Sequence, residues 1–466
     1  MGIWVPSILR DRIIQSQVMT NEERWVVFVG PYEHHSNILS WRQSIAEVIE
    51  IGLDDDGLVD METLRIQLER FKSENRPMLG TFSACSNVVG IFVDTRAIAC
   101  LLHEYGAFAC FDFAASASYV EIDMQSGKID GYDAIFLSPH KFLGGPGTPG
   151  ILMTNKNLYQ LRSSPPSTCG GGTVTCVNYF NAKDTIYYDD IEEREDAGTP
   201  PIIQKIRASL AFWIKEYIGN KEQCYIEKAL KRLLPNPNIW ILGNARVKRL
   251  AILSFLICPK TINFTSSAGD EMKHQHTTTT VVDERKRSLF MSRESQKPLH
   301  GPFAAKLLND LFGIQARDEN LSLSFRATIQ KGYLGVKPGW TRISFPYYMS
   351  NEEFDFILSA LEFIHLRFNW NTGQWTFRRK SVKDSLMGDN HSLVQLIDNL
   401  PLTSMKPNDN CIRKFDGHKS KNDLQGTESF TISLNDAKSI ADSLLNFCHE
   451  RKVPVDIDRN LVYFGI

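Results

Sequence analysis

The feature that most constrains the fold is an alternation of short apolar runs with helical patterns, which starts near residue 24. The runs are rich in β-branched and aromatic residues, as strands are. Between two of them, residues 94–106 have a helical pattern in which Asp94 is the expected N-cap and Gly106 the stop. Strands separated by helices of this length predict right-handed crossovers and a mostly parallel sheet with helices on both faces. The expected strands are 24–29, 76–83, 107–113 and 132–138.

The later part of the chain predicts a smaller C-terminal α/β domain. An amphipathic helix at 202–219 is expected to close the first domain, and three apolar runs, NIWILG, RLAILSFLI and WTRISFPYY, then predict strands. The last helix is expected to begin at Ser350, because Glu353 three residues on completes a capping box. The expected organisation is a remnant N-terminal segment at 1–22, a large and incomplete domain at 23–232, a small domain at 233–366 with a loop insertion at about 266–290, and a polar, partly disordered tail at 367–466.

Composition excludes several classes of function. Lys and Arg total 52 and Asp and Glu total 54, so the charge balance favours neither nucleic acid nor an anionic surface. No apolar run approaches the ~18 residues that a membrane span needs, and the start is too charged for a secretory signal. We therefore expect an intracellular, cytoplasmic protein. The nine cysteines contain no CxxC pair, and His274 and His276 are expected in a solvated loop, so no metal site is predicted.

Several polar residues fall at the ends of predicted strands. They are Asn87, Asp112 and the turn 138–141, and ligands of parallel sheets gather at the carboxyl ends of the strands. The turn belongs to SPHKFLGGPGTPG, residues 138–150, in which Lys141 stands beside four glycines. Such a lysine is either part of a tight structural turn or is presented to a ligand.

The order and spacing of seven short motifs favour the second interpretation. Together, over about residues 24–366, they resemble the class V aminotransferase family, and within it the cysteine desulfurases, which depend on pyridoxal 5'-phosphate. The resemblance implies the type I pyridoxal-phosphate-dependent transferase fold, an amino-acid substrate and a homodimer. The motifs are EHHSN (33–37), SN (86–87), Asp112, SPHK (138–141), GGGT (170–173), AGTP (197–200) and WTRISF (340–345).

The resemblance also implies roles at the cofactor ring. Lys141 matches the amine that forms a Schiff base with the cofactor aldehyde. Asp112 matches the carboxylate that pairs with the pyridinium nitrogen, and His34 matches the imidazole that stacks on the ring and acts as acid or base. Asn87 matches the donor to the ring hydroxyl.

Further roles concern the phosphate and the substrate. Ser138 and His140 match phosphate contacts, and Thr173 matches a phosphate contact that the other subunit supplies. Arg342 matches the arginine that binds the substrate carboxylate, which a guanidinium can hold in a bidentate manner.

Three departures from the family pattern lead to a second hypothesis. Family members carry about a hundred residues before the strand WVVFV, with a Gly-Thr-rich phosphate-binding turn, so this chain is expected to be N-terminally truncated. No cysteine occurs between Cys258 and Cys411, where desulfurases have their nucleophile, and Ala115 stands where they have a glutamine. The leading hypothesis is a pyridoxal-phosphate enzyme acting by aminotransfer, Cα–Cβ lysis or desulfuration. The alternative is a degenerate, non-catalytic homologue that serves as a scaffold or partner-binding protein.

Overall fold

The computed structural model divides the chain into two compact units. One comprises residues 1–221 and 246–250, and the other comprises 222–245 and 251–466. Residues 222–232, which the sequence places in the first domain, therefore belong to the second unit. The residues that the structure describes are 5–16, 19–20, 22–159, 165–178, 180–181, 184–213, 218–258, 298–320, 339–367, 430 and 433–437.

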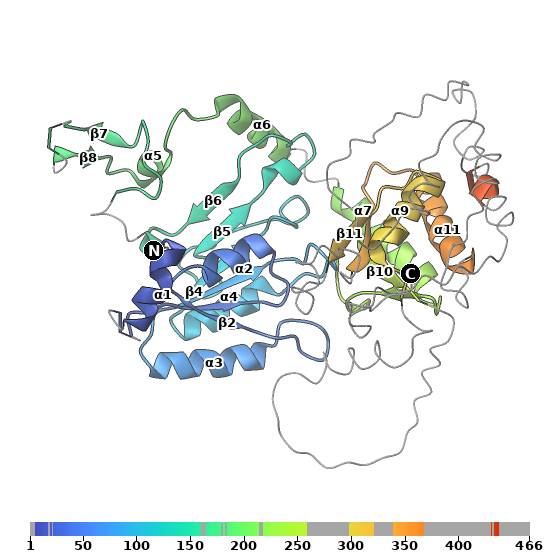
Figure 1. Ribbon diagram of the computed structural model, residues 1–466, viewed down its shortest axis with the longest axis horizontal. Coiled ribbons are helices and arrows are strands. Elements are labelled where there is room, and N and C mark those ends of the chain that lie inside the picture. Colours follow the sequence, from blue (N-terminus) through green and yellow to red (C-terminus); the bar gives the residue numbers. More distant parts are fainter. Residues whose placement is uncertain are drawn as a thin grey trace, which may run out of the picture. The chain divides into compact units, whose positions relative to one another are not determined.

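The first unit is built on a mostly parallel sheet, as the sequence predicts. Its six strands have the order β2-β1-β3-β4-β5-β6, which Figure 1 shows side by side in blue to green. All neighbouring pairs are parallel except β5 and β6, which are antiparallel. The second and the sixth strand in the chain were not predicted. The bounds are β1 (Val26–Val29), β2 (Glu47–Glu50), β3 (Met78–Ser83), β4 (Phe108–Asp112), β5 (Ala134–Leu137) and β6 (Ile151–Thr154).

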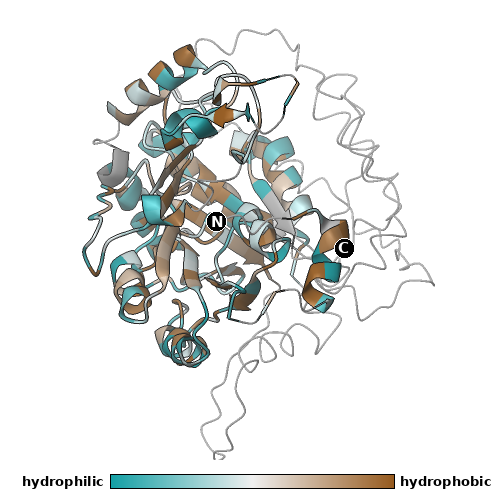
Figure 2. Cartoon of the chain, turned by 90° about the vertical axis from the view of Figure 1, so that its left-hand side faces the viewer, coloured by the Kyte–Doolittle hydropathy of each residue, from teal (hydrophilic) through white to brown (hydrophobic). Residues whose placement is uncertain are grey.

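Alternate residues of the strands enter separate cores on the two faces of this sheet. Along β1, Val26 and Phe28 pack with α3 (Met61–Ser73) and α4 (Thr95–Glu104). Val27 and Val29 lie in a smaller core, against which α2 (His35–Arg42) packs. Helices therefore cover both faces, as a parallel sheet requires. Figure 2 shows the strands mostly in brown and white, the hydrophobic part of its scale.

Helix α4 confirms the predicted cap and stop. The Asp94 carboxylate accepts a hydrogen bond from the backbone N–H of Ala97 at 3.0 Å. Gly106 has a φ of 78°, the left-handed conformation that glycine adopts at no steric cost. Ile98 and Leu102 are buried on the face that the spacing predicts.

The helix expected at 202–219 is described from Ile202 to Trp213, and this part leaves most of its apolar side chains exposed. The described helix is α6 (Ile202–Trp213), and it buries only Ala208 and Ala211 completely. Ile203 is 73% exposed and Trp213 is 82% exposed. The other elements of this unit are α1 (Ser7–Gln15), η1 (Pro139–Lys141), η2 (Lys156–Leu158), β7 (Val174–Cys176), β8 (Ile186–Tyr187) and α5 (Ile191–Glu195).

The second unit is an α/β unit with an antiparallel sheet of order β11-β12-β10-β9. The capping box at its last helix is confirmed, since Ser350 N donates to Glu353 Oε2 at 2.8 Å and Glu353 N donates to Ser350 Oγ at 3.1 Å. Strand β11 was not predicted. The elements are α7 (Ile218–Leu233), β9 (Ile239–Ile241), β10 (Ile252–Ile257), α9 (Gly301–Phe312), β11 (Arg317–Asn320), β12 (Gly339–Ser344) and α11 (Asn351–Arg367).

A short segment returns from the second unit to the first. Residues 246–250 pair with the segment that follows β3, through an antiparallel bridge between Ile91 and Arg249. Leu250 N also donates to the carbonyl of Gly90 at 2.8 Å. The segment therefore braces the turn that carries Asn87.

The predicted insertion at 266–290 and most of the predicted tail lie outside the described residues. No described helix is long and apolar enough to cross a membrane.

Candidate active site

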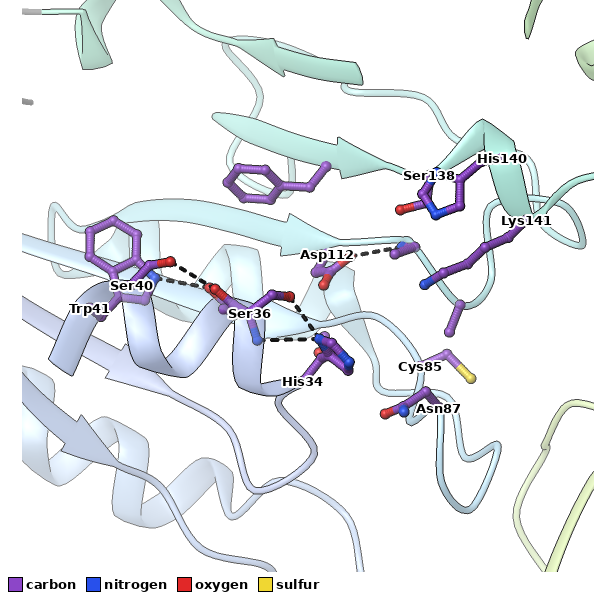
Figure 3. A pocket seen from close by; sticks show the side chains of 15 residues that line it. His34, Ser36, Ser40, Trp41, Cys85, Asn87, Asp112, Ser138, His140 and Lys141 are labelled. Carbon is purple, nitrogen blue, oxygen red and sulfur yellow. Dashed lines mark hydrogen bonds between the residues drawn. The ribbon is translucent and has the colours of Figure 1, made fainter. Parts of the chain in front are cut away.

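A cavity of about 600 Å³ opens at the carboxyl ends of the parallel strands of the first unit. Three strands contribute residues where they end, namely Ser83 of β3, Asp112 of β4 and Ser138 after β5. Helix α2 forms one side, and the turn after β5 carries Lys141 (Figure 3). The lining residues are His34, Ser36, Asn37, Ser40, Trp41, Ser83, Cys85, Asn87, Asp112, Ala114, Ala115, Phe136, Ser138, His140 and Lys141.

His34 lies at the N-cap of α2 and faces the cavity with a defined tautomer. Its Nδ1 accepts the backbone N–H of Ser36 at 3.2 Å, so the neutral ring carries its proton on Nε2. Burial lowers the pKa of His34, as do the neighbouring His35 and Lys141, while Asp112 opposes them. The ring of His35 lies 4.0 Å away, centroid to centroid. Burial and the neighbouring positive charges thus favour the neutral form of the His34 ring.

Asp112 and Asn87 reach the cavity from two neighbouring segments. Asp112 ends β4, and its Oδ1 accepts the N–H of Ala114 at 2.8 Å, which fixes the carboxylate at the strand end. Asn87 lies in a tight turn between Cys85 and Phe92, which form an isolated antiparallel bridge. Within that turn the hydroxyl of Ser86 accepts the N–H groups of residues 88 and 89, both at 3.2 Å.

The glycine-rich turn after β5 presents Lys141 toward the middle of the cavity, on the side of Asp112 (Figure 3). A Cβ atom on Gly145 would lie 1.9 Å from the carbonyl oxygen of Pro139, so only glycine allows the turn to close. Next to Lys141 in the chain, the buried ring of Phe142 packs edge to face on the ring of Phe212 of α6, with the ring centroids 4.9 Å apart. The turn is therefore packed against α6 through Phe142, while Lys141 is exposed.

The cavity brings together six of the eight predicted site residues. Thr173 does not line it: its side chain is 1% exposed, and its hydroxyl donates to the carbonyl of Gly170 at 2.8 Å within its own loop. Arg342 is half-buried on β12 of the second unit, in register with Ser254 of β10. The six residues that the cavity unites are His34, Asn87, Asp112, Ser138, His140 and Lys141.

Sequence reasoning missed the contribution of α2 to the cavity. Ser36, Ser40 and Trp41 line it, but no helix was predicted here, because α2 buries no residue completely and so has little apolar periodicity. The signal that could have found it is His34 as an N-cap, since a side chain that accepts a backbone N–H marks a helix start.

Three further residues lie near the predicted site, namely Ala115, Ser116 and Cys85. Ser116 is buried and does not line the cavity, whereas Ala115 does. Ser116 points elsewhere because β4 has already ended at Asp112 and the chain turns. Cys85 lines the cavity wall, but its thiol donates to the carbonyl of Gly90 and burial raises its pKa strongly. It is therefore a packed thiol rather than a thiolate.

The parallel sheet with a lysine, an aspartate and a histidine at its carboxyl edge defines the class of type I pyridoxal-phosphate-dependent transferase folds. The model of the aminotransferase class-V family matches residues 13–269, more than half of the chain, and the protein belongs to that family. Members of this family and of its cysteine desulfurase branch depend on pyridoxal phosphate.

The chain is also similar to individual cysteine desulfurases. It is 27% identical over 284 residues to a probable cysteine desulfurase of Streptomyces coelicolor, which covers 59% of this chain and 61% of that protein. It is 26% identical over 304 residues to a cysteine desulfurase of Haloferax volcanii, with 63% and 65% covered. The chain thus spans roughly three fifths of the length of the curated relatives it matches.

Among solved structures, a cysteine desulfurase from Thermococcus onnurineus in its apo form has the same fold. The TM-score is 0.52 at 20% identity, with 78% of each chain covered. The cysteine desulfurase CsdA of Escherichia coli gives the same score and identity, with 76% of each chain covered.

Proposed function

We propose that this protein is a pyridoxal-phosphate-dependent enzyme that acts on an amino acid, with Lys141 as the residue that carries the cofactor. The observation that carries the proposal is the convergence of Lys141, Asp112, His34 and Asn87 on one cavity. They come from four separate segments of the chain, so local packing does not explain their meeting. Catalytic groups with distinct acid–base roles in one concave site are the ordinary mark of an enzyme.

The donor set of the cavity fits this cofactor. When bound, pyridoxal phosphate supplies an aldehyde that reacts with an amine and a ring that accepts electron density. The cavity offers one primary amine at Lys141 and a carboxylate at Asp112, whose second oxygen can accept the proton of a ring nitrogen. Ser138 and His140 offer donors to a phosphate beside the glycine-rich turn. About 600 Å³ is also an ordinary size for a cofactor site.

Two residues of the chain, His34 and Lys141, would then donate and accept the protons of the reaction. Neutral His34 can donate from Nε2 and take up a proton when the site requires it. Lys141 is exposed at the tip of its turn, and its long side chain can move between the cofactor and a substrate proton. The carboxylate of Asp112 would hold the ring nitrogen of a bound cofactor, since a negative charge beside that nitrogen stabilises positive charge on it.

The cavity supports aminotransfer or Cα–Cβ lysis better than sulfur transfer through a thiolate. Among the described lining residues Cys85 is the single cysteine, and burial raises its pKa. A sulfur acceptor must be a thiolate that the substrate can reach.

We further propose that Arg342 binds the carboxylate of the substrate, that the protein assembles as a homodimer and that it is located inside the cell.

The test uses the full chain, incubated with excess pyridoxal phosphate and then reduced with borohydride. We expect a cofactor absorbance band that persists through gel filtration and a cofactor-sized mass increase on the peptide that contains Lys141. Lys141→Ala should lose both, whereas Lys156→Ala, at an exposed lysine outside the cavity, should keep both. Absence of the band and of the adduct in the unmodified protein would leave the non-catalytic alternative.

A further inference from the structure

Helix α2 carries His34 at its start, yet apolar packing does little to hold it in place. None of its residues is completely buried, and only Ile38 and Trp41 pack against the core of that face. Helices of globular proteins normally take their stability and position from a buried apolar face. Another interaction must therefore fix α2 on the sheet.

Hydrogen bonds supply that interaction, through a group of five side chains that we call the α2–β3 network: Glu33, Asn37, Trp41, Thr81 and Ser83. Glu33 Oε1 accepts the backbone N–H of Ser83 at 2.7 Å, and Glu33 Oε2 accepts the Ser83 hydroxyl at 2.9 Å. One turn along the helix, Asn37 Nδ2 donates to Glu33 Oε2 at 2.6 Å. The carboxylate thus joins the start of α2 to the last residue of β3.

The amide of Asn37 extends the network to the next turn. Its Oδ1 accepts the indole N–H of Trp41 at 2.9 Å and the hydroxyl of Thr81 at 3.1 Å. Glu33 lies just before the helix, residues 37 and 41 follow one face of it, and residues 81 and 83 follow one face of the strand. The network therefore fixes both the rotation of α2 and its position along β3.

We propose that Glu33 is a positioning residue: through the α2–β3 network it holds α2 on β3 and so sets where the imidazole of His34 lies relative to Asp112. The connection to Asp112 is direct, because Ser83 and Asp112 are register partners in neighbouring strands. Glu33 itself does not line the cavity, whereas Asn37, Trp41 and Ser83 do. The importance of this role for catalysis rests on the proposed function.

The groups around Glu33 suit a carboxylate that accepts hydrogen bonds. Three donors reach its two oxygens, and a carboxylate accepts at both. Burial raises the pKa of Glu33, the hydrogen bonds from Ser83 and Asn37 lower it, and the nearby charge of Asp112 raises it further. The charge is therefore costly to keep at this place, and the three hydrogen bonds offset that cost.

Glu33→Gln should break the network whichever way the amides turn. The amide introduced at position 33 would set its donor either against the backbone N–H of Ser83 or against Asn37 Nδ2. A flip of the Asn37 amide relieves the second contact, but it places Nδ2 where Oδ1 was. The indole N–H of Trp41, which can only donate, would then face another donor. The double variant Glu33→Gln/Asn37→Asp reverses the two roles, so that the side chain at 33 donates and the one at 37 accepts. It keeps the volume, the net charge and each hydrogen-bonded pair.

The first measurement is hydrogen exchange of the α2 amides in the protein without added cofactor. Glu33→Gln should speed exchange of these amides by about tenfold, since one or two net hydrogen bonds are lost. The double variant should return the rate to within about threefold of the unmodified protein, because its hydrogen-bonded pairs are complete. Glu104→Gln, at an exposed glutamate at the end of α4, is the matched control and should change nothing.

The second measurement is the dissociation constant of pyridoxal phosphate, with its absorbance band followed against pH. Glu33→Gln should weaken binding by about tenfold and move the pH dependence of the band, and the double variant should restore both. Unchanged exchange and binding in Glu33→Gln, or no restoration in the double variant, would overturn the inference. Failure of the unmodified protein to bind the cofactor would instead overturn the proposed function, and the exchange data would still decide whether the network holds α2.

Discussion

At the scale of single residues, the proposed function depends most on Asp112. Its carboxylate is fixed at the end of β4 by the N–H of Ala114, with the cavity on its other side. We expect Asp112→Asn to weaken pyridoxal phosphate binding and to slow turnover by about 10- to 100-fold, the value of one charge-assisted hydrogen bond. Titration of cofactor absorbance checks this, with the exposed Asp55→Asn as control. Equal affinities in the two variants would contradict it.

The lowered pKa of His34 predicts that the stability of the protein depends on pH. Its pKa lies below the usual value of 6.5, so between that value and its folded pKa the unfolded chain binds a proton that the folded protein does not. The free energy of unfolding should therefore fall as the pH drops through this window and rise again toward pH 7. Urea denaturation at several pH values should give a shallower decline for His34→Gln. An identical decline in both proteins would count against this account.

Single residues at strand ends were predictable, and single residues held by long-range contacts were not. Lys141 and Asp112 stand beside glycines or at the end of apolar runs, and these are local signals. The sequence around Glu33 does not distinguish it from an ordinary surface carboxylate, because its hydrogen-bond partner Ser83 lies fifty residues away in the chain. Thr173 was chosen from its motif, and in this chain its hydroxyl bonds within its own loop.

At the scale of elements, the turn after β5 depends on Gly145. A side chain there would meet the Pro139 carbonyl, a backbone atom that can move away only if the turn opens. Gly145→Ala should lower the free energy of unfolding by about 1–3 kcal/mol or more, as overpacking does. Urea denaturation measures this, with Gly171→Ala as control, since nothing lies within 4 Å of a Cβ at that position. Equal midpoints for the two variants would refute the steric argument.

Helix α11 offers a test of the second unit. Ser350 and Glu353 exchange hydrogen bonds at its start, so Ser350→Ala leaves the N–H of Glu353 without its acceptor. The expected loss is about 1 kcal/mol. Ser359→Ala, in the middle of the same helix, serves as the comparison and should cost less. The hydroxyl of Ser359 donates back to the carbonyl of Asp355 and accepts from the exposed side chain of Arg232, but it caps no backbone N–H.

Elements with a clear period were predictable from the sequence. The apolar runs of β1, β3, β4 and β5 and the buried face of α11 follow directly from side-chain spacing. Helix α2 was missed because hydrogen bonds rather than apolar side chains hold it. Strands β2 and β11 were missed because they carry charged residues in short runs, and pairing with their neighbours decides their conformation.

At the scale of the whole molecule, the exposed face of α6 predicts association. Five large apolar side chains of this helix are exposed: Ile202, Ile203, Ile206, Leu210 and Trp213. Contiguous apolar surface of this kind marks interaction sites, and we expect a dimer in sedimentation velocity. The double variant Ile203→Glu/Ile206→Glu should shift the protein to monomer, whereas Gln204→Glu on the same helix should not. A monomer at all concentrations of the unmodified chain would contradict the prediction.

The return of residues 246–250 to the first unit has a consequence for how the protein is made. The ribosome releases the chain from its N-terminus, so the sheet and Lys141 emerge well before this segment does. The turn that carries Asn87 acquires its bridge from Ile91 to Arg249 only after the start of the second unit has also been synthesised. Domains tend to fold as they emerge. A nascent chain arrested near residue 221 therefore holds most of the cavity wall, but the turn that carries Asn87 still lacks its brace.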